Sequence, residues 1–437
     1  MTKCNGRTIE IPAQKGRKIE INFGGGSISS DGGVLLLNQI DKKLGFTQKI
    51  ARHLKEYRDP TKVQHSLLQM LRQRVYGIAL GYEDLNDHSN LRQDPAFQTS
   101  VSKDTVLASS STLCRFENKA KRSDAIMIHQ EIVEQFIQSF KSPPKELILD
   151  FDATDDLIHG EQVGRFFHGY YGNYCFLPLY VFCGAQLLVS YLRPSNIDGA
   201  KHTWAILSLL VKRMRKTWPD VKIIFRGDSG FCRHRMLSWC DRNDVSYILG
   251  IPKNKRLEKQ ILSLTEKVRE EFVRTETKQK EFMSFQYAAQ SWTHERRIIA
   301  KVEENSLGSN IRFIVTNLQG DSQDLYDHLY CARGDMENRI KEVQLNLFAD
   351  RTSCHEWWPN QMRVLLSSVA YILLERLKSL MLQGTDLAKA QAGTIRLKLL
   401  KIGAVITRNT RRIRFSLSEH YPLKDLFFIL WEKLQAT

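Results

Sequence analysis

The sequence predicts an α/β protein whose central part is a mixed β-sheet covered by helices. Three strand-like segments follow one another from residue 145, and strand-like and helix-like segments then alternate up to about residue 250. Apolar residues at three-to-four spacing predict a helical N-terminal region before this sheet. A β-rich insertion and a helical, basic C-terminal region are expected after it. We therefore divide the chain into segments 1–142, 143–254, 255–308, 309–350 and 351–437.

The segment 1–142 opens with a polar, basic lead-in at residues 1–20. The glycine-rich stretch 24–33 lacks the Gly-Lys-Ser/Thr ending of a phosphate-binding loop, so we expect a turn before a helix that starts near Val34. Helical periodicity then continues to about residue 140, where two consecutive prolines, Pro143 and Pro144, end it.

The segment 143–254 predicts the first part of the sheet. The apolar run 174–192 is nearly long enough to span a bilayer. However, Pro178 and Gly184 interrupt it, so we expect a core hairpin with a turn at 183–185 and no membrane span. The expected order is strand 146–152, hairpin 174–192, helix 202–218, strand 221–228, helix 234–244 and strand 245–251.

The remaining segments are predicted more coarsely. Polar, charged residues with strand-like pieces among them indicate that 255–308 is an inserted β-rich segment. The sheet resumes at 311–317, and a helix follows over 323–346. The C-terminal segment opens with an amphipathic helix at 362–382 and continues with a basic, β-leaning stretch at 394–417.

The chain carries a large excess of positive charge. Its 437 residues include 64 Lys and Arg against 48 Asp and Glu, which gives a formal net charge of +16. A surplus of this size favours a polyanionic partner, with nucleic acid as the first candidate. A basic surface that binds nothing is the alternative. The 42% of hydrophobic residues is ordinary for a soluble globular protein.

The eight cysteines are expected to be buried free thiols, because no Cys-x-x-Cys pair occurs. This pattern fits a reducing cytosol, and the first residues lack the apolar core of a signal peptide, so we expect a cytoplasmic protein. Two cysteine pairs, Cys175 with Cys183 and Cys232 with Cys240, are the alternative as zinc ligands together with a nearby histidine. Structural zinc sites usually have their cysteines closer together in the sequence.

Four aspartates cluster where the strand 146–152 ends: Asp150, Asp152, Asp155 and Asp156. Asp150 and Asp152 project from the same face of an extended strand, because side chains alternate along it. Asp155 and Asp156 follow the strand, and we expect them to shape the loop or accept hydrogen bonds there. Like charges this close repel one another, so the cluster needs a positive partner.

Two further features place acidic residues in functional positions. Asp228 stands among glycines at the end of strand 221–228, a common location for functional groups in α/β sheets, although such residues often only form turns. Two strand-borne aspartates and a helix-borne glutamate can hold two Mg²⁺ ions about 3.5–4 Å apart, which would neutralise the cluster. The helix 323–346 offers one face with suitable spacing: Tyr330, Arg333, Glu337, Lys341 and Gln344.

Several blocks of this sequence resemble the DDE transposases of bacterial insertion sequences, and most closely insertion-sequence family thirteen-eighty. The blocks span most of the chain and are YEDLNDHSNLRQDPAFQ (82–98), STLCRFEN (111–118), LDFDATDDLIHGEQ (149–162), FFHGYYGNYCFLPLYVF (166–182), LRPSNIDGAKH (192–202), FRGDSGFCR (225–233) and RGDMENRIKE (333–342).

The resemblance implies a ribonuclease-H-like catalytic core, interrupted by the β-rich insertion, and a DNA-binding function for the helical N-terminal region. The family's first acidic residue lies in an Asp-x-Thr motif, which matches Asp152 and leaves Asp150 as the runner-up. Asp228 and Glu337 match the second and third. These three carboxylates are the expected catalytic residues and ligands of Mg²⁺, with Mn²⁺ as a substitute.

The resemblance also implies contacts with DNA. The family signature Tyr-x2-Arg-x3-Glu-x6-Lys fits Tyr330, Arg333 and Glu337, but position 344 is Gln, and Lys341 one turn away is the candidate substitute. Arg333 suits a terminal phosphate because its guanidinium binds in a bidentate way. Further candidates, with packing or solvated charge as the alternative, are Trp292, Arg396, Lys398, Arg408, Arg411 and Arg412.

Two smaller features leave alternatives open. Three tyrosines among glycines, Tyr170, Tyr171 and Tyr174, are candidates either for stacking on bases or for a tight turn. His159 is a candidate neighbour of the scissile phosphate, with loop packing as the favoured alternative.

These features together predict a cut-and-paste transposase of the bacterial cytoplasm, associated with the nucleoid when bound to DNA. It would cleave double-stranded DNA at the terminal inverted repeats of its element and transfer the 3′-OH into target DNA, as a homodimer in a synaptic complex. The alternatives are a structure-specific nuclease on the same fold and a domesticated DNA-binding protein without transposition activity.

Overall fold

The computed structural model describes residues 7–436 and divides into two compact units. One unit joins the two ends of the chain, residues 1–119 and 369–437, and the other comprises residues 120–368. This division differs from the predicted segments 1–142 and 351–437. Periodicity reveals that a helix has an apolar face but not which partner covers that face, so the sequence did not reveal which unit each terminal helix joins.

The second unit is built on a nine-stranded mixed sheet. Its strands are β4 (Glu146–Ala153), β8 (Leu179–Cys183), β9 (Gln186–Tyr191), β10 (Lys222–Gly227), β11 (Ser246–Ile251), β12 (Gln279–Tyr287), β13 (Arg296–Asn305), β14 (Gly308–Ser309) and β15 (Arg312–Thr316). Their order across the sheet is β12-β13-β15-β11-β10-β4-β8-β9, with β14 paired to β13.

The first strand of the sheet, β4, has a different kind of neighbour on each side. On one side β8 and β9 form the predicted antiparallel hairpin, which turns at Gly184 with a φ of 57°. On the other side β10 and β11 run parallel to β4 and to each other. Parallel strands carry the groups that follow their carboxyl ends to the same edge of the sheet. The loops after β4 and β10 therefore meet.

Alternation along β4 separates the core from the acidic side chains. Leu147, Leu149 and Phe151 are buried in the main apolar core of the unit, while Asp150 and Asp152 project from the opposite face. Three helices, which the apolar periodicity predicted, add buried side chains to this core: α7 (Arg122–Gln138), α8 (Thr203–Thr217) and α9 (His234–Arg242).

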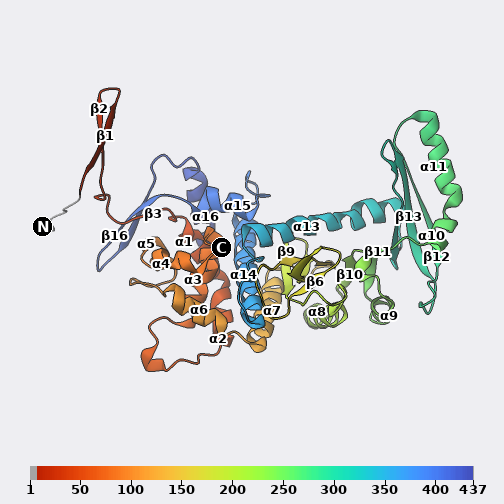
Figure 1. Ribbon diagram of the computed structural model, residues 1–437, viewed down its shortest axis with the longest axis horizontal. Coiled ribbons are helices and arrows are strands. Elements are labelled where there is room, and N and C mark those ends of the chain that lie inside the picture. The colour runs from red at the N-terminus through yellow and green to blue at the C-terminus, as the bar shows by residue number, and fades with distance from the viewer. Residues whose placement is uncertain (1–6, 437) are drawn as a thin grey trace. The chain divides into compact units, whose positions relative to one another are not determined.

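The predicted β-rich insertion, residues 255–308, begins with helices instead of strands. These are α10 (Lys255–Gln260) and α11 (Leu262–Thr275), and a narrow apolar stripe of Leu257, Ile261 and Val268 joins the core although the rest is charged. Strands β12 and β13 then form a hairpin that pairs with β15 and so extends the main sheet. Figure 1 shows α11 lying along this hairpin.

A helical segment runs from Ser322 to Asn346, as predicted, and changes its winding along the way. It contains α12 (Ser322–Asp324) and α13 (Gly334–Lys341), separated by a π-helical stretch at 325–330 and a 3-10 turn, and it ends in a second π-helical stretch at 342–346. Such π-helical turns are frequent at functional sites. The next helix is α14 (Trp357–Met381).

A smaller three-stranded sheet follows β4 in the same unit. Its strands are β5 (Asp156–Leu157), β6 (Phe166–His168) and β7 (Asn173–Phe176), in the order β5-β7-β6. Because β5 starts four positions after Asp152, this sheet is joined to the end of β4 by a very short connection.

The first unit consists mainly of helices. They are α1 (Val34–Leu44), α2 (Phe46–His53), α3 (Leu67–Leu80), α4 (His88–Leu91), α5 (Pro95–Ser100), α6 (Ser110–Asn118), α15 (Ala392–Ile395) and α16 (Lys424–Ala436). The described part of the predicted lead-in, from residue 7 onward, contains an exposed hairpin of β1 (Ile9–Gln14) and β2 (Arg17–Ile21). A three-stranded sheet comprises β3 (Ile28–Ser29), β16 (Ala404–Arg408) and β17 (Ile413–Leu417).

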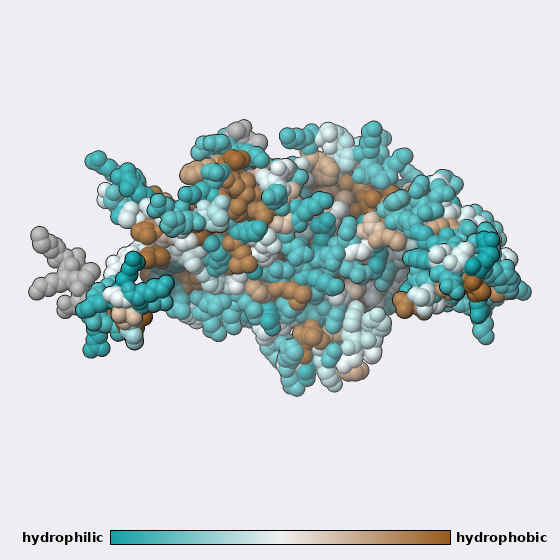
Figure 2. All heavy atoms as spheres, turned by 90° about the horizontal axis from the view of Figure 1, so that it is seen from above, coloured by the Kyte–Doolittle hydropathy of each residue, from teal (hydrophilic) through white to brown (hydrophobic). Residues whose placement is uncertain are grey.

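One glycine of the stretch 24–33 is required by packing. A Cβ atom on Gly33 would lie 1.9 Å from the carbonyl oxygen of Leu399, so the two backbones meet where only glycine fits. Among the helices of residues 7–436, none combines the length and apolar character needed to cross a membrane. On the face in Figure 2, hydrophilic side chains predominate and the hydrophobic ones gather in separate patches.

Candidate active site

Asp150 has a dedicated positive partner, Arg226 on the neighbouring strand β10. The guanidinium binds both carboxylate oxygens, with 2.7 Å between Nη2 and Oδ2, and both side chains are less than a tenth exposed. A third donor, Nη1, bonds the carbonyl of Leu329 at 2.5 Å. Burial raises the pKa of Asp150, and the ion pair opposes this. Both carboxylate oxygens of Asp150, the runner-up metal ligand, are therefore engaged by Arg226.

Asp152 lies two residues further along the same face and has no such pair. Its Oδ1 accepts a hydrogen bond from the amide of Ala153 at 2.9 Å, and its Oδ2 lies 3.8 Å from Nη2 of Arg333. The pKa of Asp152 is raised to about 7, chiefly by burial; the charge of Arg333 opposes this rise, and the negative charges of Asp228 and Glu337 contribute to it. The three predicted acids therefore act on one another across a common region.

The register of β4 and β10 explains this convergence. Asp150 pairs with Arg226 and Phe151 with Gly227, so the next residues in the two parallel strands are Asp152 and Asp228. The sequence contains a signal for this arrangement. Asp150-x-Asp152 on one strand lies beside Arg226-x-Asp228 on the other, so pairing the charges of Asp150 and Arg226 also brings the two other aspartates together.

Asp228 begins the tight turn after β10. Its Oδ1 accepts a hydrogen bond from the amide of Gly230 at 2.8 Å. This turn packs on β11 at Gly250, where an added Cβ would lie 2.8 Å from the amide nitrogen of Ser229 and 2.7 Å from the hydroxyl of Tyr330. Glycine at this position therefore lets the Asp228 turn approach the sheet together with the helical segment 322–346, which carries Glu337 and is called the acidic helix below.

Arg333 connects the acidic helix to β4. Its Nη1 donates a hydrogen bond to Oε1 of Glu337 at 2.9 Å, one turn along the helix, while Nη2 faces Asp152. The Glu337 side chain is about half exposed, whereas Arg333 is 19% exposed and its Nε is buried without a hydrogen-bond partner. The guanidinium thus supplies a positive charge between two acids and retains an unused donor.

The donor chemistry of this site suits a divalent metal ion. Asp152, Asp228 and Glu337 offer carboxylate oxygens, the ligands that Mg²⁺ prefers, and their mutual repulsion favours binding of a cation. Within residues 7–436, however, no group of three His, Cys, Asp or Glu side chains is placed to hold a metal. Since Arg333 contacts both Asp152 and Glu337, metal binding requires these side chains to rearrange.

Gln344 has a clear role that the sequence pattern did not reveal. Its Nε2 donates a hydrogen bond to the backbone carbonyl of Asp155 at 3.0 Å, across 189 positions of sequence. The bond ties the end of the acidic helix to the loop directly after Asp152. Lys341, the predicted substitute for the family lysine, is exposed on the same helix.

Asp156 accepts a hydrogen bond, as predicted for the loop after β4. The donor is Oγ1 of Thr352, 2.8 Å from Oδ2, while Oδ1 is buried without a partner. Burial raises the pKa of Asp156 to about 8, and the charges of Asp350 and Asp155 add to this effect. His159, in contrast, is exposed.

Two aromatic candidates for DNA contact are partly packed. Tyr330 lies against Tyr326 with 5.5 Å between ring centroids, and burial raises the pKa of its hydroxyl. Trp292 joins the edge of the core, with its ring 5.8 Å from that of Tyr287 and beneath the guanidinium of Arg296 at 5.2 Å. Packing is the alternative that the sequence had left open for Trp292.

The basic C-terminal candidates divide into two groups. Arg396 donates to the carbonyls of Ile78 and Ala79 at the end of α3, and Arg408 donates to Gln98 and Thr99, so both guanidinium groups hold the first unit together. The other three, Lys398, Arg411 and Arg412, are exposed. Arg411 and Arg412 lie in the turn between β16 and β17.

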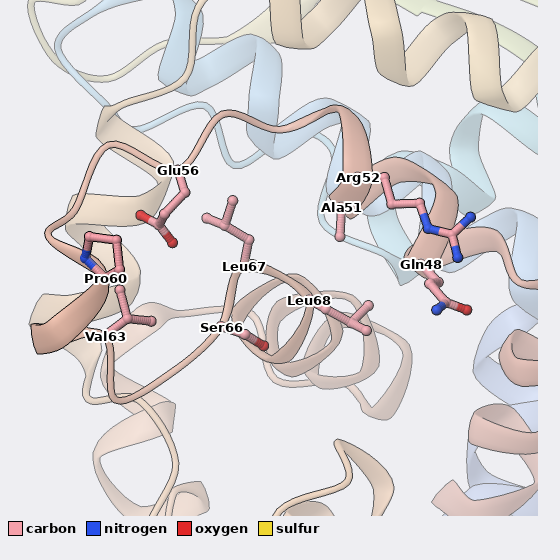
Figure 3. Close-up of a pocket in the computed structure, with 9 residues that line it drawn as sticks. All are labelled: Gln48, Ala51, Arg52, Glu56, Pro60, Val63, Ser66, Leu67 and Leu68. Atoms are coloured by element: carbon pink, nitrogen blue, oxygen red, sulfur yellow. The ribbon is translucent and has the colours of Figure 1, made fainter.

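Six cysteines of residues 7–436 are free thiols: Cys114, Cys175, Cys183, Cys232, Cys240 and Cys331. Cys175 and Cys240 are buried as expected, whereas Cys114 and Cys331 are exposed, and Cys4 lies outside the described residues. A cavity of about 570 Å³ lies in the first unit between α2 and α3. None of the predicted catalytic acids lines it, and Figure 3 shows its walls: Gln48, Ala51, Arg52, Glu56, Pro60, Val63, Ser66, Leu67 and Leu68.

Comparisons with known proteins bear on the whole chain. The model of the family described as transposase DDE domain group 1 matches residues 11–437. No curated protein matches. Among solved structures, the chain is similar to the piggyBac transposase in a cryo-EM synaptic complex with hairpin DNA. The identity is 10% and the TM-score 0.43, over 85% of this chain and 79% of that chain.

Proposed function

Because the chain belongs to the transposase DDE domain group 1 family, we propose that it catalyses cut-and-paste DNA transposition. It would cleave double-stranded DNA at the ends of its element and transfer the freed 3′-OH into target DNA. The motif blocks support a place in insertion-sequence family thirteen-eighty. The strand order, with β4 between an antiparallel hairpin and two parallel strands, supports a ribonuclease-H-like core.

The observations that support this proposal are that Arg333 contacts both Asp152 and Glu337, and that the register of β4 and β10 sets Asp152 beside Asp228. All three would hold Mg²⁺, for which Mn²⁺ would substitute. The bound ions would activate the attacking oxygen and stabilise the leaving oxygen in phosphodiester displacement. Asp152 is the principal ligand because it is buried, unpaired with Arg226 and repelled by both other acids.

The chain's own residues would position the DNA. Arg333, with its unused donor, would bind a phosphate near the scissile bond once it leaves the acids. Exposed basic residues would bind the backbone further away, and Lys341, Arg411 and Arg412 are the candidates. Two copies would bring two element ends together, so we propose a homodimer in the synaptic complex.

A cleavage assay on labelled element ends tests this function. Asp152→Ala, Asp228→Ala and Glu337→Ala should each abolish cleavage with Mg²⁺ or Mn²⁺ and leave end binding within about twofold. Asp220→Ala is the matched control, because Asp220 is an exposed aspartate that precedes the first residue of β10, whereas Asp228 follows the last one. Full cleavage by Asp228→Ala would contradict the proposal. Cleavage without strand transfer would indicate a nuclease, and end binding without cleavage a domesticated DNA-binding protein.

A further inference from the structure

A hairpin beside the candidate active site exposes an unusual number of aromatic rings. We call residues 165–176, which contain β6, β7 and the turn between them, the aromatic hairpin. Tyr170 is 86% exposed, Phe167 58%, Tyr174 50% and Phe166 41%. Rings of this size normally contribute to a core, and an exposed group of them marks an interaction site.

The aromatic hairpin is joined to the strand that carries Asp152. β5 begins four positions after Asp152 and pairs with β7 through Asp156 and Phe176. The amide of Ile158 also donates to the carbonyl of Tyr174 at 3.0 Å. The hydroxyl of Tyr171 donates a hydrogen bond to the carbonyl of Ala153, the residue after Asp152, at 3.5 Å. The exposed rings therefore keep a fixed place near the acids.

The rings contact one another mainly by their edges. Phe167 and Tyr174 meet at 72° with centroids 5.7 Å apart, and Tyr170 and Tyr171 at 86° and 5.0 Å. An edge-to-face contact covers a face of only one of the two rings, and Tyr170 remains 86% exposed, so open ring surface is left for a ligand. Arg165 adds a cation 4.9 Å from the ring of Tyr174. The turn itself requires only a residue with positive φ, which Gly172 supplies at 69°, so folding does not explain the aromatic side chains.

The chemistry of the hairpin favours nucleic-acid bases over an apolar protein partner. Three of its rings are tyrosines, an arginine lies among them, and the whole chain has a net charge of +16. Aromatic faces with nearby cations bind bases of any sequence by stacking. A base inside a duplex stacks on both neighbours and is paired, so unpaired bases offer these rings the most accessible faces.

We propose that the aromatic hairpin binds unpaired DNA bases next to the phosphate that is cleaved, with Tyr170 as the principal stacking residue. This inference rests on the proposed function, since it takes DNA as the substrate. Removing a base from the helix costs a few kcal/mol, and stacking on the hairpin would offset this cost. The site would therefore favour distorted or frayed element ends over intact duplex.

The test compares two DNA duplexes of the same sequence, one blunt and one with a single-stranded overhang that carries the fluorescent base aminopurine. Binding is measured without divalent metal, so cleavage does not enter. Loss of one stacking residue should weaken overhang binding about 5- to 150-fold. We expect this loss for Tyr170→Ala, while blunt binding stays within about twofold.

Two control variants complete the design. Tyr170→Phe keeps the ring, so it should bind the overhang like the wild type and quench aminopurine equally. Trp204→Ala removes another exposed aromatic ring, on α8 of the same unit, and should leave the binding of both DNAs unaffected. Equal losses on blunt and overhang DNA, or unchanged overhang binding by Tyr170→Ala, would overturn the inference. Wild-type protein that binds neither DNA would instead contradict the proposed function.

Discussion

The ion pair between Asp150 and Arg226 allows the two neighbouring aspartates of β4 to be separated by experiment. If Asp150 is structural, replacing it alone should lower the stability of the protein. Replacing Arg226 as well, so that two apolar side chains meet, should recover much of the lost stability. If Asp150 is a metal ligand, no second substitution on β10 will restore metal binding. The variants are Asp150→Leu, Arg226→Met and the double variant.

The expected magnitude follows from burial. Both side chains are less than a tenth exposed, so either single substitution leaves an uncompensated buried charge, which costs about 3–5 kcal/mol. In a unit of this size, residues 120–368, each kcal/mol shifts the melting temperature by about 2–4 °C, so a fall of about 6–20 °C is expected. Apolar replacement of both partners of a buried pair is often neutral. The unpaired Leu329 carbonyl would still cost about 1–3 kcal/mol.

Thermal unfolding and Mn²⁺ binding are the two measurements. Both single variants should unfold at lower temperature than the double variant, and the folded double variant should bind Mn²⁺ like the wild type. A single Asp150→Leu change that leaves the melting temperature intact would refute the structural role. A stable double variant that has lost Mn²⁺ would identify Asp150 as a ligand.

Three further predictions follow from the site. Gln344→Ala should lower the rate of cleavage with little change in end binding, because the loop after Asp152 loses its bond to the acidic helix; a variant with wild-type cleavage would show that this bond is dispensable. Gly250→Ala should reduce both cleavage and stability, since its Cβ would displace the Asp228 turn. The exposed Gly403→Ala is the control and should reduce neither, because an added Cβ there meets no other atom; equal effects of the two variants would contradict this reasoning. Asp156 has a pKa raised to about 8 in the folded protein against an ordinary value of 3.8, so the folded state holds a proton that the unfolded state releases between these values. Stability should therefore fall as the pH rises through this window. Asp156→Asn should remove this fall in stability with pH. At pH 8.5 it should raise the free energy of unfolding by at least about 1.4 kcal/mol, the equivalent of one pKa unit. Chemical denaturation at several pH values measures this, and a variant whose stability falls with pH like the wild type would contradict the prediction.

The sequence predicted the central sheet well because its strands have strong local signals. The β-branched and aromatic runs of β4, β10 and β11, and the turn of the β8–β9 hairpin at Gly184, depend on neighbours within a few residues. Alternation also placed Asp150 and Asp152 on one face. These features arise from backbone geometry that each segment carries by itself.

The partners of the acidic residues could not be predicted in the same way. Arg226 meets Asp150 only through the register of two parallel strands, and Gln344 meets the Asp155 carbonyl across 189 positions. The helices at 255–275 were missed because only a narrow stripe of apolar residues is buried, so high charge was the stronger local signal. Tertiary packing decides each of these cases.

The central claim is that Asp152, Asp228 and Glu337 bind the catalytic metal ions. The most direct measurement is anomalous scattering from crystals of the protein bound to an element end in the presence of Mn²⁺. We expect metal peaks bonded to carboxylate oxygens of Asp152 and Asp228, with Glu337 released from Arg333 and Asp150 still paired with Arg226. A metal ion bonded to Asp150, or DNA bound with no metal at Asp152, would contradict the account.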